Sequence, residues 1–237
     1  MNLIRLSITD FRQILREQLL WVMFIVAPAA QFALARWLVP ELIAAFPVFD
    51  GYQVLIAGAF TVQVVSGIGF VMAMMLLDEK DDGVLSAIRV LPLGPGAFLI
   101  YRLFTATMIA VIFGFAMLYF SGLVAFSVGE AFAAALLFAL ICPAVVLFMS
   151  TYGDNKVEGL AMYKGVNLVL LLPIVSFFVP DGWHFALGFI PDFWSFHFTA
   201  ALAGEQDIPW LFFGLGVLAH LLLIGLLYRQ FRRRVFH

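Results

Sequence analysis

The chain alternates long apolar runs with short polar breaks. Six of the runs are long enough for a helix to cross the hydrocarbon core of a bilayer, which takes about 20 residues. We therefore expect transmembrane helices over residues 18–39, 52–77, 103–126, 131–152, 159–179 and 208–228. The predicted fold class is an all-α integral membrane protein with a single transmembrane domain over residues 1–237.

The segment before the first span has a different pattern. Between residues 1 and 17, apolar side chains recur at three- and four-residue spacing, with arginines among the polar positions. This pattern predicts an amphipathic helix that lies in the membrane interface. A cleavable signal peptide is the rival interpretation, because residues 33–35 (Ala-Leu-Ala) have the form of a cleavage site. The length of the charged section, with Asp10 and Glu17 inside it, favours the interfacial helix.

The longest charged interruption, residues 78–97, follows the second span. It opens with four carboxylates and one lysine and continues through Gly83, which allows a turn. Apolar residues then recur at helical spacing and fall on one face of a short helix: Val84, Leu85, Ile88 and Leu91. A solvated linker between two spans is the plainer interpretation. A linker has no physical reason to carry an apolar face, so we predict a short helix that docks against another protein.

The segment at residues 180–207 is rich in aromatic side chains but also contains carboxylates and histidines. If it crossed the membrane, the basic tail of the chain would face the outside, against the preference of basic residues for the cytoplasmic side. We therefore predict an outer re-entrant or interfacial helical hairpin between spans five and six. With this topology both termini are cytoplasmic, and every basic residue except Arg36 lies on the cytoplasmic side.

Composition agrees with this topology and excludes several classes of function. With 64% hydrophobic and 12% charged residues, the chain lies far outside the composition of soluble domains. The single cysteine, Cys142, excludes an intramolecular disulfide. No Gly-x-x-x-x-Gly-Lys-Ser/Thr phosphate loop occurs, so we expect the chain to bind no ATP by that motif. The basic tail is expected to anchor the topology and to bind no nucleic acid.

Catalytic and metal sites have little support in the sequence. Ser66 and His220 are candidates for the dyad of a membrane protease, but Val64 stands two residues before the serine, where such proteases have glycine. His184 and His197 are 13 residues apart without a cysteine or a close-spaced partner, so we predict no metal site. No carboxylate lies inside a predicted span, which argues against a proton- or sodium-driven carrier.

Polar residues inside the predicted spans are the candidates for an internal substrate path: Gln31, Gln63, Ser66, Asn167 and Ser176. The alternative is that they form interhelical hydrogen bonds, which contribute about 0.6 kcal/mol each on average. His220 is the one ionisable group expected deep in a span. We predict a neutral imidazole that is hydrogen-bonded to a neighbouring helix.

Two polar segments resemble a known family. Glu79, Gly83, Leu85 and the sequence Leu91-Pro92-Leu93 resemble the cytoplasmic loop of type-2 ATP-binding-cassette (ABC) transporter permeases, whose short coupling helix contacts the ATPase subunit. Residues 155–161 (Asn-Lys-Val-Glu-Gly-Leu-Ala) resemble the loop before the fifth span in drug-export members. The resemblance implies that both loops carry ATPase-coupling residues: Glu79, Gly83, Leu85, Ile88, Arg89, Leu91, Asp154, Lys156 and Glu158.

The resemblance also implies a function. The chain would be the permease subunit of a bacterial ABC exporter that moves hydrophobic or amphiphilic, drug-like compounds out of the cytoplasm or inner leaflet. It would not be an enzyme and would bind no cofactor: two copies of a separate ATPase would bind ATP and Mg²⁺. The permease would pair with itself or with a related permease in the lipid bilayer of the inner membrane. Lipid, glycan or peptide export by the same family is one alternative, and a non-transporting membrane scaffold or immunity protein is another.

Overall fold

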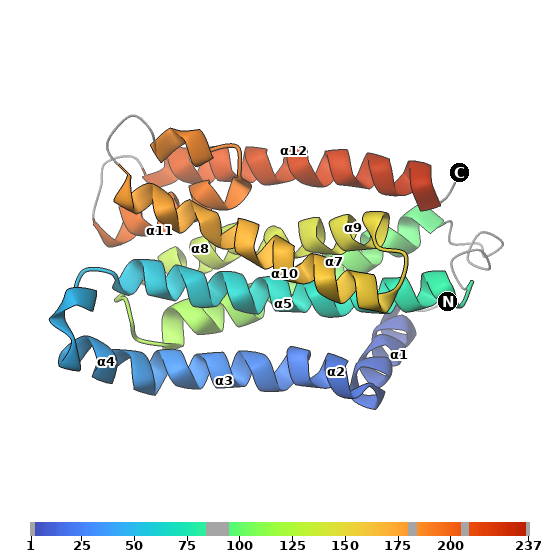
Figure 1. Cartoon of the computed structure of the whole chain (residues 1–237), viewed down its shortest axis with the longest axis horizontal. Coiled ribbons are helices and arrows are strands. Elements are labelled where there is room, and N and C mark those ends of the chain that lie inside the picture. The colour runs from blue at the N-terminus through green and yellow to red at the C-terminus, as the bar shows by residue number, and fades with distance from the viewer. Residues whose placement is uncertain (1–2, 84–94, 180–183, 205–208, 236–237) are drawn as a thin grey trace.

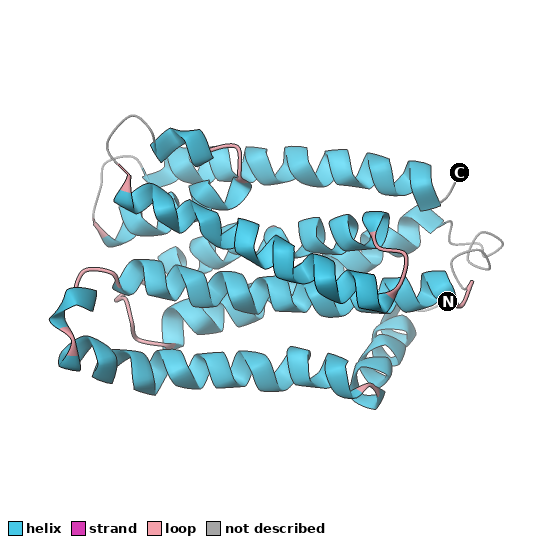
Figure 2. Cartoon of the chain, in the orientation of Figure 1, coloured by secondary structure: helices cyan, strands magenta, loops and turns pink. Residues whose placement is uncertain are grey.

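The computed structural model describes residues 3–83, 95–179, 184–204 and 209–235, and every regular element in these ranges is a helix (Figure 2). The α-helices are α1 (Leu3–Arg16), α2 (Gln18–Trp21), α3 (Ala27–Ala33), α4 (Val39–Ala45), α5 (Gln53–Asp81), α7 (Pro95–Phe120), α8 (Val128–Ala139), α9 (Ile141–Tyr152), α10 (Lys156–Leu171), α11 (Pro191–Ala203) and α12 (Pro209–Val235). The π-helical turns are η1 (Val22–Val26) and η2 (Leu34–Leu38), and the 3₁₀ segments are η3 (Pro47–Phe49), η4 (Leu172–Phe178) and η5 (His184–Leu187). The long helices lie side by side in one bundle, and α1 crosses the bundle end at a steep angle (Figure 1).

Six stretches of the described residues are long and apolar enough to cross a membrane: Gln18–Ala45, Gln53–Asp81, Gly96–Phe120, Val128–Tyr152, Lys156–Phe178 and Pro209–Arg234. They overlap the six runs expected from the sequence, which confirms the all-helical class with six candidate spans. Helix α7 begins at Pro95, earlier than the expected start at residue 103. Proline suits the first turn of a helix, since the backbone N–H that it lacks would have no partner there.

Prolines set the irregular turns of the first span. The π-helical turn η1 ends two residues before Pro28, and η2 ends two residues before Pro40. A proline inside a helix removes a backbone hydrogen bond and presses its ring against the preceding turn, so that turn departs from α geometry. The first span is therefore a continuous helical rod with two wide turns, and Gln31 lies between them.

Helix α5 is the central helix of the bundle. The most apolar part of α5 is 72% buried, whereas the corresponding parts of Lys156–Phe178 and Pro209–Arg234 are each 17% buried. A helix that is apolar on all sides is expected to be surrounded by other helices, and α7, α9 and α10 all pack against α5. The outer helices α10 and α12 instead present large apolar side chains at the surface, such as Leu168 and Leu222.

Two predicted elements lie outside the described residues in whole or in part. The short helix expected between Val84 and Leu91 is outside them entirely. Of the outer hairpin expected at residues 180–207, the structure describes η5 and α11. Helix α11 packs against α12, α5 and α8, with Phe193, Phe196 and Phe198 buried. The re-entrant hairpin stays a prediction, while α11 belongs to the core of the bundle.

Candidate functional site

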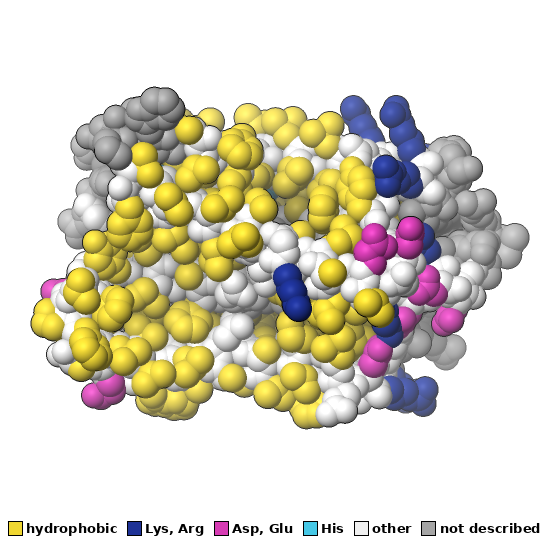
Figure 3. Space-filling view, viewed as in Figure 1, with side chains coloured by type: hydrophobic (Ala, Val, Ile, Leu, Met, Phe, Trp, Pro, Cys, Tyr) yellow, Lys and Arg dark blue, Asp and Glu magenta, His cyan; other side chains and the backbone are white. Residues whose placement is uncertain are grey.

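Three consecutive residues at the end of α5 each contact a different part of the chain. Successive side chains of an α-helix point about 100° apart, so Asp78, Glu79 and Lys80 leave the helix in three directions. Glu79 contacts α7, Asp78 contacts the start of α10, and Lys80 contacts the turn between α9 and α10. Charged side chains gather at this end of the bundle, whereas hydrophobic side chains cover most of the rest of the face that Figure 3 shows.

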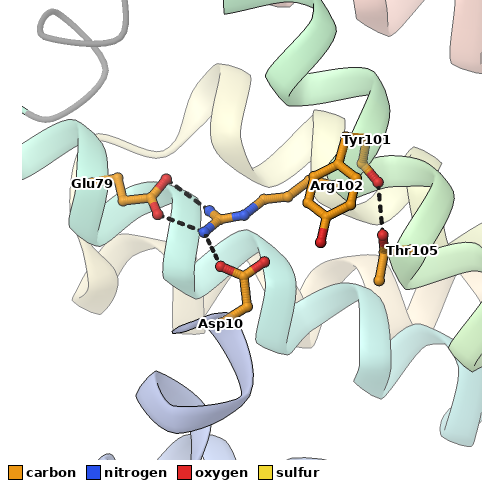
Figure 4. A network of polar contacts seen from close by, with 5 residues as sticks. All are labelled: Asp10, Glu79, Tyr101, Arg102 and Thr105. Carbon is orange, nitrogen blue, oxygen red and sulfur yellow. Dashed lines mark hydrogen bonds and ion pairs between the residues drawn. The ribbon is translucent and has the colours of Figure 1, made fainter. Parts of the chain in front are cut away.

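Arg102 joins three helices at this end of the bundle (Figure 4). Its Nη1 and Nη2 donate hydrogen bonds of 2.7 Å and 2.6 Å to the two carboxylate oxygens of Glu79 on α5. Nη2 also donates a hydrogen bond of 2.8 Å to Asp10 Oδ1 on α1. The paired geometry of guanidinium and carboxylate adds directional specificity to the charge attraction. The Arg102 side chain thereby fixes α1 and the end of α5 to the second turn of α7.

Burial makes this contact more than a surface ion pair. The exposed fractions of the Arg102, Asp10 and Glu79 side chains are 3%, 9% and 14%. The Arg102 guanidinium carbon also lies 4.9 Å from the centroid of the Phe98 ring, one turn earlier on α7. Removing one partner from a buried ion pair typically costs about 3–5 kcal/mol, because the charge that remains is left without a counter-ion. The triad therefore resists separation of the three helices.

A second set of ion pairs joins the start of α10 to this cluster. Lys156 Nζ lies 2.6 Å from Asp78 Oδ2 and also forms an ion pair with Glu17, which stands at the junction of α1 and α2. Glu17 lies where the chain turns from α1 into the first span. Lys156 thereby connects the end of α1, the end of α5 and the start of α10. Like Arg102, it is paired with two carboxylates from different segments of the chain.

The turn before α10 is built by hydrogen bonds of its own. Asn155 Oδ1 accepts a hydrogen bond from the Glu158 backbone N–H, and the Glu158 side chain accepts one from the Asp154 N–H. These bonds satisfy backbone donors at the start of the helix. Lys80 Nζ donates to the Gly153 carbonyl oxygen at 2.9 Å and lies 3.4 Å from Asp154 Oδ1. The predicted coupling residues Asp154, Lys156 and Glu158 thus occur together beside the end of α5.

Gly83 lies two residues after the end of α5 at Asp81 and leads into the predicted coupling loop. Its φ of 70° lies in the left-handed region that glycine adopts without strain. Of the predicted coupling residues in this loop, the structure describes Glu79 and Gly83. The others, Leu85, Ile88, Arg89 and Leu91, lie outside the described residues. Both ends of the loop are nevertheless placed, because the Glu79–Arg102 contact joins the helices that precede and follow it.

Four of the five predicted path residues come together in the interior of the bundle. Ser66 Oγ donates a hydrogen bond of 3.1 Å to Asn167 Oδ1 and lies 3.2 Å from the Tyr163 hydroxyl oxygen. A cavity of about 60 Å³ beside them is lined by polar and apolar residues of the first span, α5 and α10, and the polar ones are Gln31, Gln63, Tyr163 and Asn167. The Gln31 Oε1 atom is buried and has no hydrogen-bond partner among the described residues. This cavity is one of the buried polar regions of the bundle.

Ser176 and His220, the other polar residues singled out in the sequence, lie away from the Gln31 cavity. Ser176 on η4 donates to the Pro173 carbonyl oxygen and lies 3.1 Å from His197 Nε2, so the structure does not bring it to the Gln31 cavity. Ser66 and His220 are hydrogen-bonded to other groups and not to each other, which removes the geometry of a protease dyad. Within the described residues, no group of His, Cys, Asp and Glu side chains has an arrangement that would hold a metal ion.

Sequence reasoning missed several members of these sites. The contact between Asp10 and Arg102 was not predicted. The available signal was the position of Arg102 beside a long apolar run, because a charged side chain in such a place is usually paired with an opposite charge. Tyr163 was also missed. It lies four residues before Asn167, which places both side chains on one face of α10. That spacing was the available signal.

The chain matches a family of known proteins along nearly its whole length. The family described as "Fluoroquinolones export permease protein Rv2686c-like" matches residues 10–228. The chain is similar to the fluoroquinolones export permease protein Rv2686c of Mycobacterium tuberculosis (strain ATCC 25618 / H37Rv), with 28% identity over 233 residues that cover 95% of this chain and 92% of the relative. The fluoroquinolones export permease protein MT2760 of Mycobacterium tuberculosis (strain CDC 1551 / Oshkosh) has the same identity and coverage. No solved structure shows a significant match.

Proposed function

Because this chain belongs to the Rv2686c-like family of fluoroquinolone export permeases, which are ABC permeases, we propose that it exports fluoroquinolones or similar amphiphilic aromatic compounds with energy from a separate ATPase. The observation that carries the proposal is the family match over residues 10–228. The polar cavity inside the bundle and the charged cluster at its end support it, since export requires a path and a point of attachment for the motor.

The ATPase is a partner and not a part of this chain, whose sequence has no phosphate loop. In the proposed assembly, two ATPase subunits bind ATP and Mg²⁺, and a second permease, a copy of this chain or a related one, completes a two-fold arrangement. Apolar side chains on the outer helices support the pairing of permeases. Trp37 on the first span and Leu168 on α10 are 67% and 68% exposed.

Motion of the ATPase is proposed to enter through the loop that follows Gly83 and through the turn at Asp154–Glu158. The buried Glu79–Arg102 contact supports this proposal, because it ties the two helices that hold the loop into one unit. Lys156 and Lys80 extend the same connection to the start of α10. A displacement of the loop is then passed to α5, α7 and α10 together, and α5 and α10 line the polar cavity. In this mechanism the ATPase shifts the populations of the inward and outward states.

The substrate path is proposed to follow Gln31, Gln63, Ser66 and Asn167, with Lys164 at its edge. Lys164 is exposed on α10, about 12 Å along the helix from Lys156 at 1.5 Å per residue. A lysine in the hydrocarbon core costs about 2.5–3.5 kcal/mol on insertion scales. This cost supports a water-filled path or a second subunit beside this face of α10, and not lipid. A fluoroquinolone carries a carboxylate, which the Lys164 ammonium group attracts.

The proposed orientation places the charged cluster and both termini in the cytoplasm of a bacterial cell with this chain in its inner membrane. The gathering of basic side chains at one end of the bundle supports this orientation (Figure 3), because basic residues accumulate on the cytoplasmic side of membrane proteins. Helix α1 and the last turns of α12 lie at that same end (Figure 1).

The first experiment isolates the tagged protein from native membranes under mild conditions and measures ATP hydrolysis by the proteins that copurify. We expect an ATPase subunit to copurify with the wild type. Leu85→Asp places a charge on the apolar face of the predicted coupling helix and is expected to abolish the association. Val48→Asp likewise replaces an aliphatic side chain with a carboxylate, at a 71% exposed position outside both proposed coupling segments, and serves as the control. Copurification without any protein that carries a phosphate loop would contradict the proposal.

A transport measurement in the same cells tests the path. Lys164→Gln is expected to weaken fluoroquinolone binding about tenfold or more, since a hydrogen bond to a charged group contributes about 1.5–3 kcal/mol and 1.4 kcal/mol corresponds to a factor of ten. Drug accumulation should rise accordingly. Lys164→Arg keeps the charge and should keep most of the export. Equal export by both variants would remove Lys164 from the path while leaving the ATPase result unaffected.

A further inference from the structure

Three polar side chains are buried at the contact between α11 and α12. Asp192 and Ser195 lie one turn apart on α11, His220 lies on α12, and none of the three is more than 1% exposed. Both carboxylate oxygens of Asp192, Ser195 Oγ and His220 Nε2 have no hydrogen-bond partner among the described residues. Most buried polar groups in proteins are hydrogen-bonded, so this cluster requires an explanation that export does not provide.

The hydrogen-bonding state of His220 follows from its own helix. His220 Nδ1 lies 2.8 Å from the Gly216 carbonyl oxygen, one turn earlier on α12. A carbonyl oxygen only accepts hydrogen bonds, so Nδ1 carries the hydrogen and donates it. In a neutral imidazole the other nitrogen, Nε2, is then an acceptor. This nitrogen faces Asp192 Oδ1 at 3.9 Å, so two acceptors oppose each other unless a proton lies on one of them. The sequence predicted a bond from this imidazole to a neighbouring helix, and the structure instead places it within α12.

An ionised carboxylate at this position would have no donor to stabilise it. Moving an unpaired carboxylate into an apolar interior is so unfavourable that such groups usually take up a proton. Burial accordingly raises the pKa of Asp192 well above its ordinary value. A hydrogen bond between oxygen and nitrogen spans about 2.7–3.2 Å, whereas Asp192 Oδ1 and His220 Nε2 are 3.9 Å apart, so the two side chains must move closer for the protonated carboxyl group to donate to His220.

Among the described residues, no other charged side chain is paired with Asp192 or His220. Helix α11 meets α5 at Gly58, whose missing side chain leaves room for Phe196, far from the charged end of α5. Segment η4 contains no titratable residue, and His197 on α11 is directed to Ser176 and Phe177. The other titratable groups of the packed helices are Asp78, Glu79, Lys80 and Asp81 at the end of α5, Glu130 at the start of α8, Cys142 and Tyr152 on α9, and Tyr228, Arg229, Arg232, Arg233 and Arg234 in the last turns of α12.

We propose that Asp192 and His220 together bind one proton at the contact between α11 and α12, held as a carboxyl O–H that donates to the imidazole Nε2. The pair is then neutral, which allows α11 to pack against α12 inside the bundle. The proton comes from solvent when α11 packs in place and returns to solvent when the pair ionises. This proton site does not depend on the identity of the exported compound or of the ATPase.

The linkage between protons and folding has a definite sign. The Asp192 carboxyl ionises near pH 3.8 in the unfolded chain, whereas burial raises its pKa well above that value in the folded protein. The folded protein therefore keeps a proton that the unfolded chain releases. The stability that this proton contributes is full below pH 3.8 and is lost as the pH rises through the raised pKa. The contact of α11 with α12 is thus predicted to weaken as the pH rises from 3.8 toward the raised pKa of Asp192.

Infrared spectroscopy of the purified full-length protein in detergent tests the proposal. We expect the wild type at neutral pH to show the C=O stretching band of a protonated carboxyl group. Asp192→Asn should lose this band, whereas Asp50→Asn, which changes an exposed carboxylate, should keep it. His220→Gln keeps Asp192 and should shift the band by changing the group that the carboxyl faces. Absence of the band in the wild type, or its persistence in Asp192→Asn, would overturn the proton site.

Thermal unfolding between acid and alkaline pH gives a second measurement. Asparagine has the shape of aspartic acid and offers an N–H donor to Nε2 at every pH. The unfolding temperature of Asp192→Asn should therefore rise relative to that of the wild type as the pH increases, while Asp50→Asn follows the wild type. A constant difference between Asp192→Asn and the wild type across the pH range would mean that Asp192 binds no proton in this range, and would also overturn the proposal.

Discussion

The charged cluster at one end of the bundle and the titratable pair between α11 and α12 differ in how their polar atoms are satisfied. Arg102 donates three hydrogen bonds to Asp10 and Glu79, whereas neither carboxylate oxygen of Asp192 has a partner among the described residues. Both groups are buried, with exposed fractions of 3% for Arg102 and 1% for Asp192. Burial alone therefore does not decide whether a group stays charged in this protein. Whether a buried group stays charged also depends on how many opposite charges and hydrogen-bond donors face it.

The largest expected effect comes from breaking the charged cluster. Arg102→Leu leaves Asp10 and Glu79 buried without their cation and should lower the free energy of unfolding by about 3–5 kcal/mol. Unfolding of the purified protein in mixed detergent micelles measures the change. Arg102→Lys keeps the charge but cannot reproduce the paired hydrogen bonds of the guanidinium, so an intermediate loss is expected. If Arg102→Leu unfolds like the wild type, the hydrogen bonds of Arg102 do not stabilise the charged cluster, and the contrast with the unpaired Asp192 fails.

Close packing, and not charge pairing, is expected to dominate the contact between α11 and α12. A methyl group at Gly216 would lie 3.0 Å from Leu137 Cδ1 and from Trp194 Cβ, so Gly216→Ala should destabilise the protein by about 1–3 kcal/mol. Gly214→Ala is the matched control on the same helix, since nothing lies within 4 Å of the added methyl group. That variant should be neutral or slightly more stable, because alanine favours helix. Equal unfolding temperatures for the two variants would contradict the close packing.

The smallest effect is expected from a charged contact that is not buried. Lys80 and Asp154 form an ion pair whose side chains are 29% and 84% exposed. Such pairs contribute about 0.2–1 kcal/mol and are screened by salt. Asp154→Asn should therefore change the free energy of unfolding by no more than about 1 kcal/mol. Repeating the measurement at high salt should remove most of the difference. A loss as large as that of Arg102→Leu would mean that exposure does not separate the strong contacts of this cluster from the weak ones.

The sequence predicted the membrane class and the approximate spans because a run of about 20 apolar residues has few other stable environments. Three of the residues proposed for a substrate path, Gln31, Gln63 and Asn167, line the polar cavity, and Ser66 is hydrogen-bonded to Asn167. Their role in transport stays a prediction. For Ser176, polarity alone could not distinguish one buried polar environment from another. Periodicity along one helix specifies a face, and it does not specify which helix covers that face.

Contacts between distant segments were beyond sequence reasoning. Asp10 and Arg102 are 92 residues apart, and their contact depends on how α1 crosses the end of the bundle. The position of Asp192 was hidden for a related reason. The charge balance across the membrane only required the segment at residues 180–207 to return to the side from which it came. The charge balance did not determine how deeply α11 packs among the other helices.

The two π-helical turns of the first span determine the register of that helix. Each wide turn is equivalent to one residue inserted into a regular α-helix, and one residue corresponds to a rotation of about 100°. The stretch that carries Gln31 is thus turned relative to α2, and α4 is turned again relative to that stretch. An insertion or deletion of one residue at Val22–Val26 would leave the span long enough for the membrane but would point Gln31 away from Gln63 and Asn167. In related chains, the number of residues in the segment that corresponds to Val22–Val26 should therefore predict the direction of the Gln31 side chain better than the identity of the apolar residues in that segment does.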